Sequence, residues 1–446
     1  MNKNQPRFTN RDLLRISIPL MIEQLLSLGV GLADSLMVAQ VGEAAISAVS
    51  LVDTVNLLLI YLFTGIASGG AAVVGQYLGR NDREKANHSS QQLMLITVEI
   101  SLLIMALFYL GKGFVLNVVY GDVAPDVAAH AETYYTIVES SIPFLAIYSV
   151  GAGLFRIMGS TKISMWVSFA MNAINVAGNA IMILGLGMGV EGVAIPTLIS
   201  RVVAAAAMVV LLRKKDRPVY LRSMTLRHDK DAVRDILRFG LTNGAESCSY
   251  QMGRILLLST VSGLGTAAVA ANAIGGTLTN LQAFTGNAMD LVMVTVVAQC
   301  VGARDYEAAR YYTWKIIRWS YVAIFFSCGA VVLLRPMLMA FYHVSPETEW
   351  YAAMIVWMYA AGSVVLWPVS FVLPYALRSA GDTKYTMVVT VASMWLTRVL
   401  LGVVLVRVFH YGVLAIWVAG FVDWAARAIV LIPRFASGKW KTMGVK

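Results

Sequence analysis

The feature that most constrains this chain is a series of apolar stretches, each about 20 residues long, that recurs from one end to the other. As an α-helix, such a stretch crosses the ~30 Å hydrocarbon core of a bilayer. In lipid every backbone polar group must be paired internally, so only helices and closed barrels span membranes. Barrel strands would be shorter, at about 10 residues, and would alternate in polarity. The sequence therefore predicts an all-α integral membrane protein.

Six such stretches are found in each half of the chain. The predicted spans of the first half are Leu14–Val38, Ala45–Gly75, Leu93–Leu110, Tyr134–Leu154, Ile163–Leu184 and Val193–Leu212. Those of the second half are Ile236–Val261, Ala268–Val297, Ile316–Leu334, Tyr351–Leu377, Tyr385–Val408 and Val413–Ile432. The composition agrees with twelve spans, because 58% of the residues are hydrophobic and 13% are charged, against roughly 25% charged in soluble domains.

The two halves of the chain repeat one another. VVGQYLGRNDREKA at Val73–Ala86 returns as VVAQCVGARDYEAA at Val296–Ala309, which places Gln76 and Gln299 at an interval of 223 residues. RDLLR at Arg11–Arg15 returns as RDILR at the same interval. Because each half holds an even number of spans, both halves have the same orientation, and the repeat is a parallel one about an axis along the membrane normal.

The basic residues predict the topology. Of the 35 Lys and Arg residues, 28 fall on one side of the predicted spans and three on the other, and the first side is expected to be cytoplasmic. The remaining four, Arg201, Arg254, Arg398 and Arg427, lie within spans. We therefore predict a multi-pass protein of the cell inner (plasma) membrane with both termini in the cytoplasm. Its expected parts are an N-lobe at 1–212, a linker at 213–235 that includes a short amphipathic surface helix, and a C-lobe at 236–446.

Several functional classes are disfavoured. The formal charge of +10 is accounted for by orientation, and no basic-aromatic stretch indicates nucleic-acid binding. Three cysteines form neither a disulfide framework nor a metal-ligand spacing. We find no paired histidines, nucleophile elbow or Gly-rich phosphate loop, so the chain is not expected to be an enzyme, to need a cofactor or to use ATP. Any transport would then draw on an ion gradient.

Acidic residues inside the predicted spans are the strongest functional signal. The predicted spans contain four arginines but eight acids, which are Glu23, Asp34, Asp53, Glu99, Glu139, Glu246, Asp290 and Asp423. An ionisable group at mid-membrane costs at least ~3 kcal/mol and therefore tends to mark an ion or substrate path. An acidic excess suits protons, sodium or organic cations.

Each acid also has a structural interpretation. Asp34 could be a solvated helix end, although a facing Asp53 would make the two carboxylates a proton carrier. Asp290 could bind an ion or pair with Arg254 or another buried base. Glu23 and Glu246 occupy equivalent repeat positions, which favours packing or gating. Asp423 and Arg427 are four residues apart on a helix and are expected to form an ion pair.

Polar residues also gather in the fifth predicted span. Asn172, Asn175 and Asn179 are three and four residues apart, so they share one face of a helix. Hydrogen bonding to a neighbouring helix and coordination of a cation explain this face equally well.

The ordered motifs of the chain resemble one family. The stretches IPLMIEQLLSLGVGLADSLMVAQVG, GGAAVVGQYLGRND, MNAINVAGNAIMILGLGMGVEGVAIPT and LGTAAVAANAI are similar to the MATE family of multidrug and toxic compound extrusion transporters. The resemblance covers nearly the whole chain. It implies two six-helix lobes in a V around a central cavity, with exchange of cationic amphipathic compounds for protons or sodium.

The resemblance also implies site residues. In the DinF-like branch an N-lobe cation site corresponds here to Asp34, Asn175, Asn179 and Thr197. Asn179 stands where that branch has a second acid. The NorM-like branch has acids in the C-lobe where this chain has Tyr250 and Trp367, so neither branch is matched in full.

These observations lead to one expected function and one alternative. We expect a monomeric antiporter in contact with membrane lipid that exports organic cations in exchange for H⁺ or Na⁺ by alternating access. Asp34, Asn175, Asn179, Thr197 and Asp53 are the expected coupling residues. Asp290, Glu246 and Arg254 are expected to bind substrate or coupling ion in the C-lobe, and Glu23 to gate or pack. No structural metal is expected, but Na⁺ is a candidate at Asp34. The alternative is a flippase of lipid-linked saccharides or another amphipathic anion, for which the four arginines would supply a basic cavity.

Overall fold

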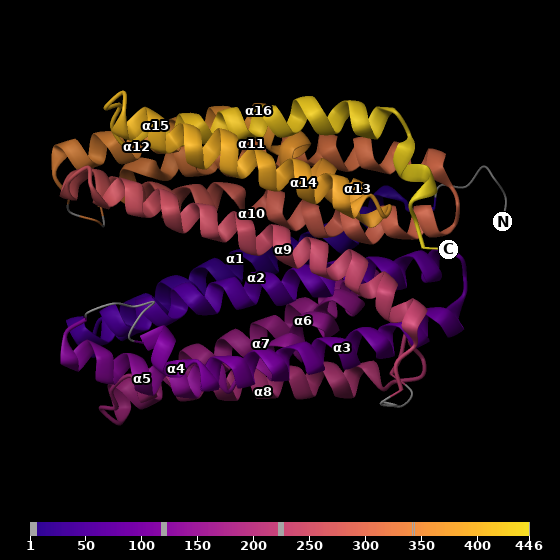
Figure 1. Ribbon diagram of the computed structural model, residues 1–446, viewed down its shortest axis with the longest axis horizontal. Helices are drawn as coiled ribbons and strands as arrows, with labels where there is room; N and C mark the ends of the chain where they lie inside the picture. Colours follow the sequence, from indigo (N-terminus) through magenta and orange to yellow (C-terminus); the bar gives the residue numbers. More distant parts are fainter. Residues whose placement is uncertain (1–6, 117–122, 222–226, 341, 343, 446) are drawn as a thin grey trace. The chain divides into compact units, whose positions relative to one another are not determined.

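The computed structural model describes residues 7–116, 123–221, 227–340, 342 and 344–445, and these residues contain helices and no strand (Figure 1). The helices up to residue 212 are α1 (Asn10–Val38), α2 (Glu43–Gly79), α3 (Arg83–Leu110), α4 (Lys112–Phe114), α5 (Pro125–Glu139), α6 (Ile142–Ile157), α7 (Thr161–Asn179) with the π-helical turn η2 (Ala180–Gly185), and α8 (Glu191–Leu212). The prediction of an all-α membrane fold is confirmed.

The second half repeats this order. Its helices are α9 (Lys230–Ser262), α10 (Thr266–Gly302), α11 (Tyr306–Ala340), α12 (Pro346–Trp367), η3 (Pro368–Val372), α13 (Leu373–Ser379), α14 (Thr383–Ser393), η4 (Met394–Leu400), α15 (Leu401–Arg407), α16 (Leu414–Ala436) and η5 (Lys439–Thr442). Here η3 and η4 are π-helical turns and η5 is a 3₁₀ turn. Two prolines, Pro368 and Pro374, flank the break at η3, as expected because proline removes a helix hydrogen bond.

Ten helical segments of the described residues are long and apolar enough to cross a membrane. The bent pair α5 and α6, which meet at 46°, would make an eleventh span. The helix α9 occupies the place of the remaining predicted span, but its first turns carry Lys230, Asp231, Arg234, Asp235 and Arg238. The stretch predicted as a short amphipathic surface helix is helical from Lys230 on, but it is not short, because it forms the first turns of α9 without a break.

The described residues divide into two compact units. One comprises Ile18–Gly244, here the N-unit, and the other Met1–Ser17 with Ala245–Lys446, here the C-unit. The boundaries fall inside α1 and α9. The start of α9 therefore belongs to the N-unit, where α2 approaches it closely: a side chain added at Gly69 would lie 2.4 Å from the carbonyl oxygen of Phe239. Small residues at such a crossing let two helix backbones touch.

The repeated motif at Val73–Ala86 and Val296–Ala309 is a turn followed by a helix cap. Asn81 and Arg304 have left-handed backbone conformations, with φ of 61° and 58°. The next residue in each motif, Asp82 or Asp305, accepts a hydrogen bond from the backbone N–H three residues on, at 3.0 and 2.9 Å. A carboxylate in this position pairs a helix N–H that would otherwise lack an acceptor. The motif occurs twice because α3 and α11 each need such a start.

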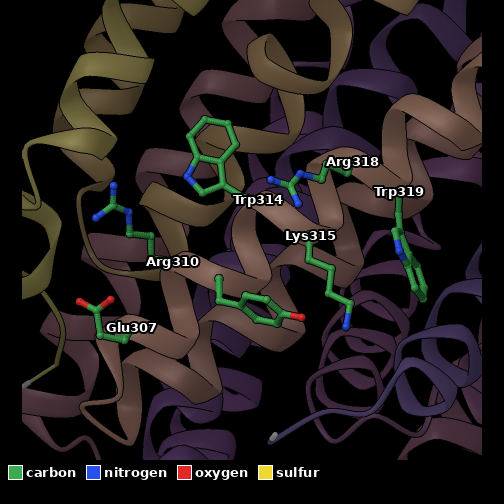
Figure 2. Close-up of a pocket in the computed structure, with 7 residues that line it drawn as sticks. Glu307, Arg310, Trp314, Lys315, Arg318 and Trp319 are labelled. Carbon is green, nitrogen blue, oxygen red and sulfur yellow. The ribbon is translucent and has the colours of Figure 1, made fainter.

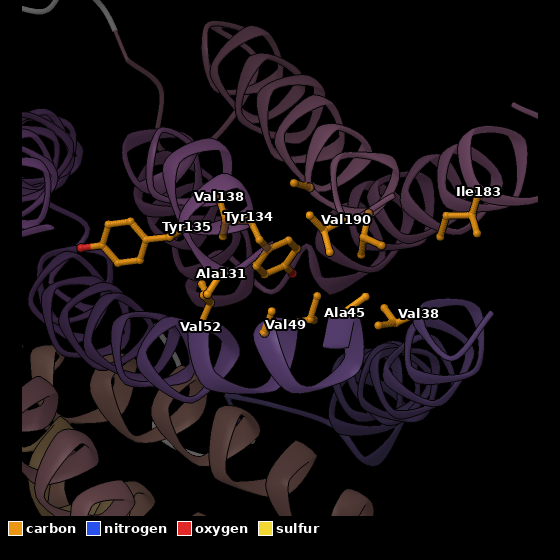
Figure 3. Close-up of a cluster of buried hydrophobic side chains, with 13 residues drawn as sticks. Val38, Ala45, Val49, Val52, Ala131, Tyr134, Tyr135, Val138, Ile183 and Val190 are labelled. Atoms are coloured by element: carbon orange, nitrogen blue, oxygen red, sulfur yellow. The ribbon is translucent and has the colours of Figure 1, made fainter. Parts of the chain in front are cut away.

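A cluster of buried apolar side chains holds α1, α2, α5 and α8 of the N-unit together (Figure 3). Tyr134 belongs to this cluster and is 3% exposed, with Val49 and Val190 beside its ring (Figure 3). Its hydroxyl reaches out of this apolar cluster and donates to Asp53 on α2. The core therefore fixes the position of one group in the polar site described next.

Candidate ion-coupling sites

The four residues predicted for the N-unit cation site come together in the structure. Asp34 on α1 accepts a hydrogen bond from the amide Nδ2 of Asn179, at the end of α7, over 2.8 Å. One turn earlier on α7, Asn175 contacts the hydroxyl of Thr197 on α8 at 3.0 Å. Both asparagines are buried, whereas Asp34 and Thr197 are partly exposed. Three helices thus supply carboxylate, carboxamide and hydroxyl groups to one place.

The side chain of Asn175 fits this site in two orientations. In one, its Nδ2 donates to Thr197 and its oxygen faces the Asp34 carboxylate. Turned by 180°, the amide donates to both carboxylate oxygens, at 3.0 and 3.2 Å, and its oxygen accepts from Thr197. The second orientation gives hydrogen-bond donors to both oxygens of an Asp34 carboxylate that is charged and has no ion bound. The first leaves the amide oxygen against the carboxylate with no donor between them, and only a cation or a proton on Asp34 would satisfy it.

One further oxygen at this site has no hydrogen-bond partner. Asn179 is fully buried, and its Oδ1 has no partner among the described residues although its Nδ2 binds Asp34. A buried polar atom without a partner costs about 1–3 kcal/mol, so its presence calls for an explanation. An oxygen beside a carboxylate is a suitable ligand for Na⁺ or for a protonated group.

A second acidic group lies next to Asp34. Asp53 on α2 is within electrostatic range of Asp34 and accepts a hydrogen bond from Tyr134 at 3.2 Å. These two acids were expected to face one another, and the structure brings them within electrostatic range. Unlike Asp34, Asp53 also interacts with a base, Arg201 on α8. The two carboxylates therefore have different surroundings.

Sequence reasoning missed the part that Glu139 and Arg201 play in this group. Arg201 is 8% exposed and donates to Ser141 at 2.7 Å and to Asn56 at 3.4 Å. Glu139, at the end of α5, is 1% exposed, and neither carboxylate oxygen has a hydrogen-bond partner among the described residues. Its position inside a span was the available signal. Asp53 and Glu139 both interact electrostatically with Arg201, and Asp34 lies beside Asp53.

The C-unit brings Glu246 and Asp290 to one arginine. Glu246 on α9 forms an ion pair with Arg378 on α13, Oε1 to Nη2, at 3.2 Å. Asp290 on α10 is 6% exposed and interacts electrostatically with the same guanidinium. One oxygen of each acid, Oε2 and Oδ1, is buried and unpaired in the described part of the chain. Arg254, the base named first as a partner of Asp290, is exposed on α9, so that pairing is wrong, and the alternative of another buried base is met by Arg378.

The equivalent pair in the N-unit is complete. Glu23 on α1 forms an ion pair with Arg156 on α6, and Ser164 donates to its other carboxylate oxygen at 3.1 Å. At the repeat interval of 223, the position of Asp290 corresponds to Ala67. At this repeated position the N-unit therefore has one acid for one arginine, whereas the C-unit has two acids for one. Both carboxylate oxygens of Glu23 have partners, whereas its counterpart Glu246 has one buried oxygen without a partner in the described structure.

A basic cluster occupies another part of the C-unit. Asp423 on α16 pairs with Arg427 at 2.9 Å, as predicted from their spacing, and also lies 3.9 Å from Arg398 on η4. Arg398 donates to the hydroxyl of Tyr250 at 3.1 Å, and its own Nε–H is buried without an acceptor among the described residues. Trp367 stacks on Phe371 nearby, with ring centroids 4.7 Å apart. Two arginines to one acid give this cluster a net positive charge.

The fold and these sites are those of a particular class of membrane protein. Long apolar helices in a doubled arrangement, with charged groups buried between them, are typical of secondary transporters of the inverted- or parallel-repeat type. The model of the MatE family matches residues 19–181 and 244–404, one match in each repeat. The chain therefore belongs to the MatE family.

Relatives and solved structures agree with this assignment. The uncharacterized transporter YisQ of Bacillus subtilis is 23% identical over 441 residues, which cover 97% of this chain and 96% of YisQ. The probable multidrug resistance protein NorM of Thermotoga maritima is 22% identical over 443 residues, covering 98% and 94%. The crystal structure of MATE in complex with MaL6 matches with a TM-score of 0.89 at 20% identity over 97% of both chains. The predicted family membership is confirmed.

Proposed function

We propose that this protein is a secondary antiporter that exports amphipathic organic cations in exchange for H⁺ or Na⁺, with the coupling ion at Asp34. The observation that carries the proposal is the set of oxygens around that carboxylate. Asp34 has the amides of Asn175 and Asn179 as neighbours rather than a base, and the buried oxygen of Asn179 is unpaired in the described structure. The names of relatives, including the multidrug resistance protein NorM of Thermotoga maritima, support the substrate class.

The proposed chemistry follows from the charge of this group. With the site empty, the Asp34 carboxylate is charged and takes hydrogen bonds from Asn179 and from the turned amide of Asn175. A proton or Na⁺ cancels the charge, and the Asn175 oxygen can then face the occupied site. Coupling requires that the ion and the organic cation prefer different states of the transporter, so that each shifts the population in the opposite direction.

The test is transport by the full chain in liposomes loaded with a fluorescent organic cation. A proton gradient and a sodium gradient are imposed separately, and wild type is compared with Asp34→Asn. The matched control is Glu43→Gln, which removes a charge from an exposed residue at the start of α2. We expect one gradient to drive export by wild type and by the control, and Asp34→Asn to lose this dependence. Gradient-driven transport that survives in Asp34→Asn would exclude Asp34 as the coupling site.

The C-unit acids form a second candidate for coupling. Glu246 and Asp290 share one guanidinium, so this group carries an excess negative charge that a proton or cation would balance. Asp290→Asn in the same assay distinguishes the two places. If it abolishes the gradient dependence while Asp34→Asn keeps it, the coupling site is in the C-unit. Arg254 is exposed and is not part of this proposal.

A second function, transport of an amphipathic anion such as a lipid-linked saccharide, is favoured by a different observation. The cluster of Arg398, Arg427 and Asp423 has a net positive charge, and Arg398 has an N–H group free for an acceptor in the described structure. The same liposomes loaded with a fluorescent lipid-linked phosphosugar test it. Export of this anion, lost in Arg398→Gln, together with no transport of organic cations under either gradient, would favour the second function.

We also propose that the protein lies in the cell inner (plasma) membrane as a monomer. Its orientation follows from the charge distribution and places both termini in the cytoplasm. The 28 basic residues predicted on one side support this orientation. Labelling of single cysteines introduced at Lys214 and at Lys112, in intact cells with a thiol reagent that does not cross membranes, tests it. We expect labelling at Lys112 and none at Lys214.

A further inference from the structure

The first turns of α11 carry a basic and aromatic surface that no proposed transport step uses. A cavity of about 590 Å³ lies here, lined by Glu307, Arg310, Tyr311, Trp314, Lys315, Arg318 and Trp319 (Figure 2). The residues follow two rows of one helix, at steps of four. Arg310, Trp314 and Arg318 make one row, and Tyr311, Lys315 and Trp319 make the other. We call these seven residues the α11 basic surface.

The charges of this surface are unbalanced. Glu307 is its one acid, and it lies 3.7 Å from the amino group of Lys441. Arg310, Lys315 and Arg318 form no ion pair within the described residues. Lys315 lies over the ring of Tyr311, with its Nζ 5.3 Å from the ring centroid. Three cations are therefore presented together with no carboxylate to neutralise them.

The corresponding surface in the other half of the repeat is covered. At the interval of 223, Arg310 and Lys315 correspond to Asn87 and Gln92 on α3. Asn87 accepts from the backbone of Tyr220 at 2.9 Å, and Gln92 donates to the carbonyl of Arg227 at 2.9 Å. The linker thus occupies this face of α3. On α11 the polar groups that would bind such a segment are replaced by bases and aromatic rings, so the face is built for another kind of occupant.

An apolar surface continues directly from these bases along α11. Val322, Phe325 and Phe326 follow within two turns and are 56%, 59% and 68% exposed. Such side chains on a membrane protein face acyl chains. Tryptophan and tyrosine beside bases, at the edge of an apolar belt, mark the level of the lipid head groups. A ligand with a negative head and an apolar tail would match both parts of this helix.

We propose that the α11 basic surface binds the head group of an anionic phospholipid, in the leaflet that the charge distribution predicts to be cytoplasmic. Arg310, Lys315 and Arg318 contact the phosphate, Trp314 and Trp319 lie against the glycerol region, and the acyl chains follow the exposed face beyond Val322. Each base near an anionic membrane surface contributes about 1 kcal/mol. Removal of all three bases therefore weakens the preference for anionic over zwitterionic lipid by a factor on the order of 100.

The experiment uses the full chain in vesicles of brominated phosphatidylglycerol mixed with phosphatidylcholine, because bromine quenches nearby tryptophan. Vesicles in which the phosphatidylcholine is brominated instead give the reference. Wild type should show excess quenching by phosphatidylglycerol, and the excess should fall in Trp314→Phe/Trp319→Phe. It should also fall in the triple variant Arg310→Gln/Lys315→Gln/Arg318→Gln.

The matched control is Arg213→Gln/Lys214→Gln/Lys215→Gln, which removes the same charge from exposed residues after α8 and should keep the excess quenching. Circular dichroism establishes that both triple variants are folded, and Arg318→Gln alone replaces the triple variant if that one is not. Equal quenching in wild type and the base-free variant overturns the proposal. Loss of the excess in inorganic phosphate, but not in chloride of the same ionic strength, also overturns it, because the surface would then bind free phosphate.

Discussion

Replacement of Arg378 by methionine is the sharpest test of the charge balance in the C-unit. The guanidinium is 3.2 Å from Glu246 and also interacts with Asp290, and both acids are less than a tenth exposed. Without it, two carboxylates are buried with no base beside them. Removal of one partner from a buried ion pair costs about 3–5 kcal/mol. At roughly 2–4 °C per kcal/mol for a unit of this size, we expect the melting temperature to fall by about 6–20 °C.

The assay is thermal unfolding of the detergent-purified protein with a thiol-reactive fluorophore. Cys300 and Cys328 are buried in the C-unit, so their reactivity reports its opening. Arg378→Met should melt well below wild type. Arg378→Met combined with Glu246→Gln and Asp290→Asn should regain most of the loss, because the buried charges are then gone. Asp290→Asn alone should melt at or slightly above the wild-type temperature.

The N-unit supplies the matched comparison. Arg156→Met leaves one carboxylate, Glu23, which keeps its hydrogen bond from Ser164. The melting temperature of Arg156→Met should fall by less than that of Arg378→Met. Circular dichroism, recorded for all variants, gives this comparison. The reasoning would be refuted if Arg378→Met melted within about 2 °C of wild type, less than the change expected for 1 kcal/mol. It would equally be refuted if neutralising both acids brought no recovery.

Three further predictions concern packing, the linker and the ion site. Gly69→Ala places a side chain 2.4 Å from the backbone of α9 and should destabilise the protein by about 1–3 kcal/mol, whereas Gly276→Ala, with open space around it, should be neutral or stabilising in the same melting assay. A backbone N–H two residues on and the ring of His88 hold the pKa of Asp229 below its ordinary value. The stability that this carboxylate adds is therefore present above pH ~4 and lost as the pH falls further, and because the pair is nearly half exposed it is less than ~1 kcal/mol. Hydrogen exchange in the linker should be faster in Asp229→Asn than in wild type at pH 7, and equal once both lack the charge. Thr197→Val removes the hydroxyl beside Asn175 and should weaken binding of the coupling ion about tenfold. The readout is a higher ion concentration for half-maximal transport. An unchanged ion dependence would exclude the hydroxyl from the site.

The sequence by itself determined the membrane fold and its doubling. Span length and polarity are local properties, since about 20 apolar residues have no stable place except across a bilayer. The repeated turn and cap at Asp82 and Asp305 are also local, because each side chain bonds a backbone N–H three residues away. At α9 the charged residues suggested a short surface helix, whereas the structure has one continuous helix from Lys230. There the tertiary contact at Gly69 gives the first turns of α9 a place in the N-unit.

The partners of the buried charges were decided by the tertiary structure. Asp34 and Asn179 are 145 residues apart in sequence, and only the resemblance to a family joined them before the structure did. Spacing along the helix predicted the Asp423–Arg427 pair, but no spacing in the sequence pointed to Arg378 as the base beside Asp290. An ion pair within one helix follows from its 3.6-residue period. Which of several distant charges meet inside a bundle depends on the packing of whole helices, and no local pattern contains that information.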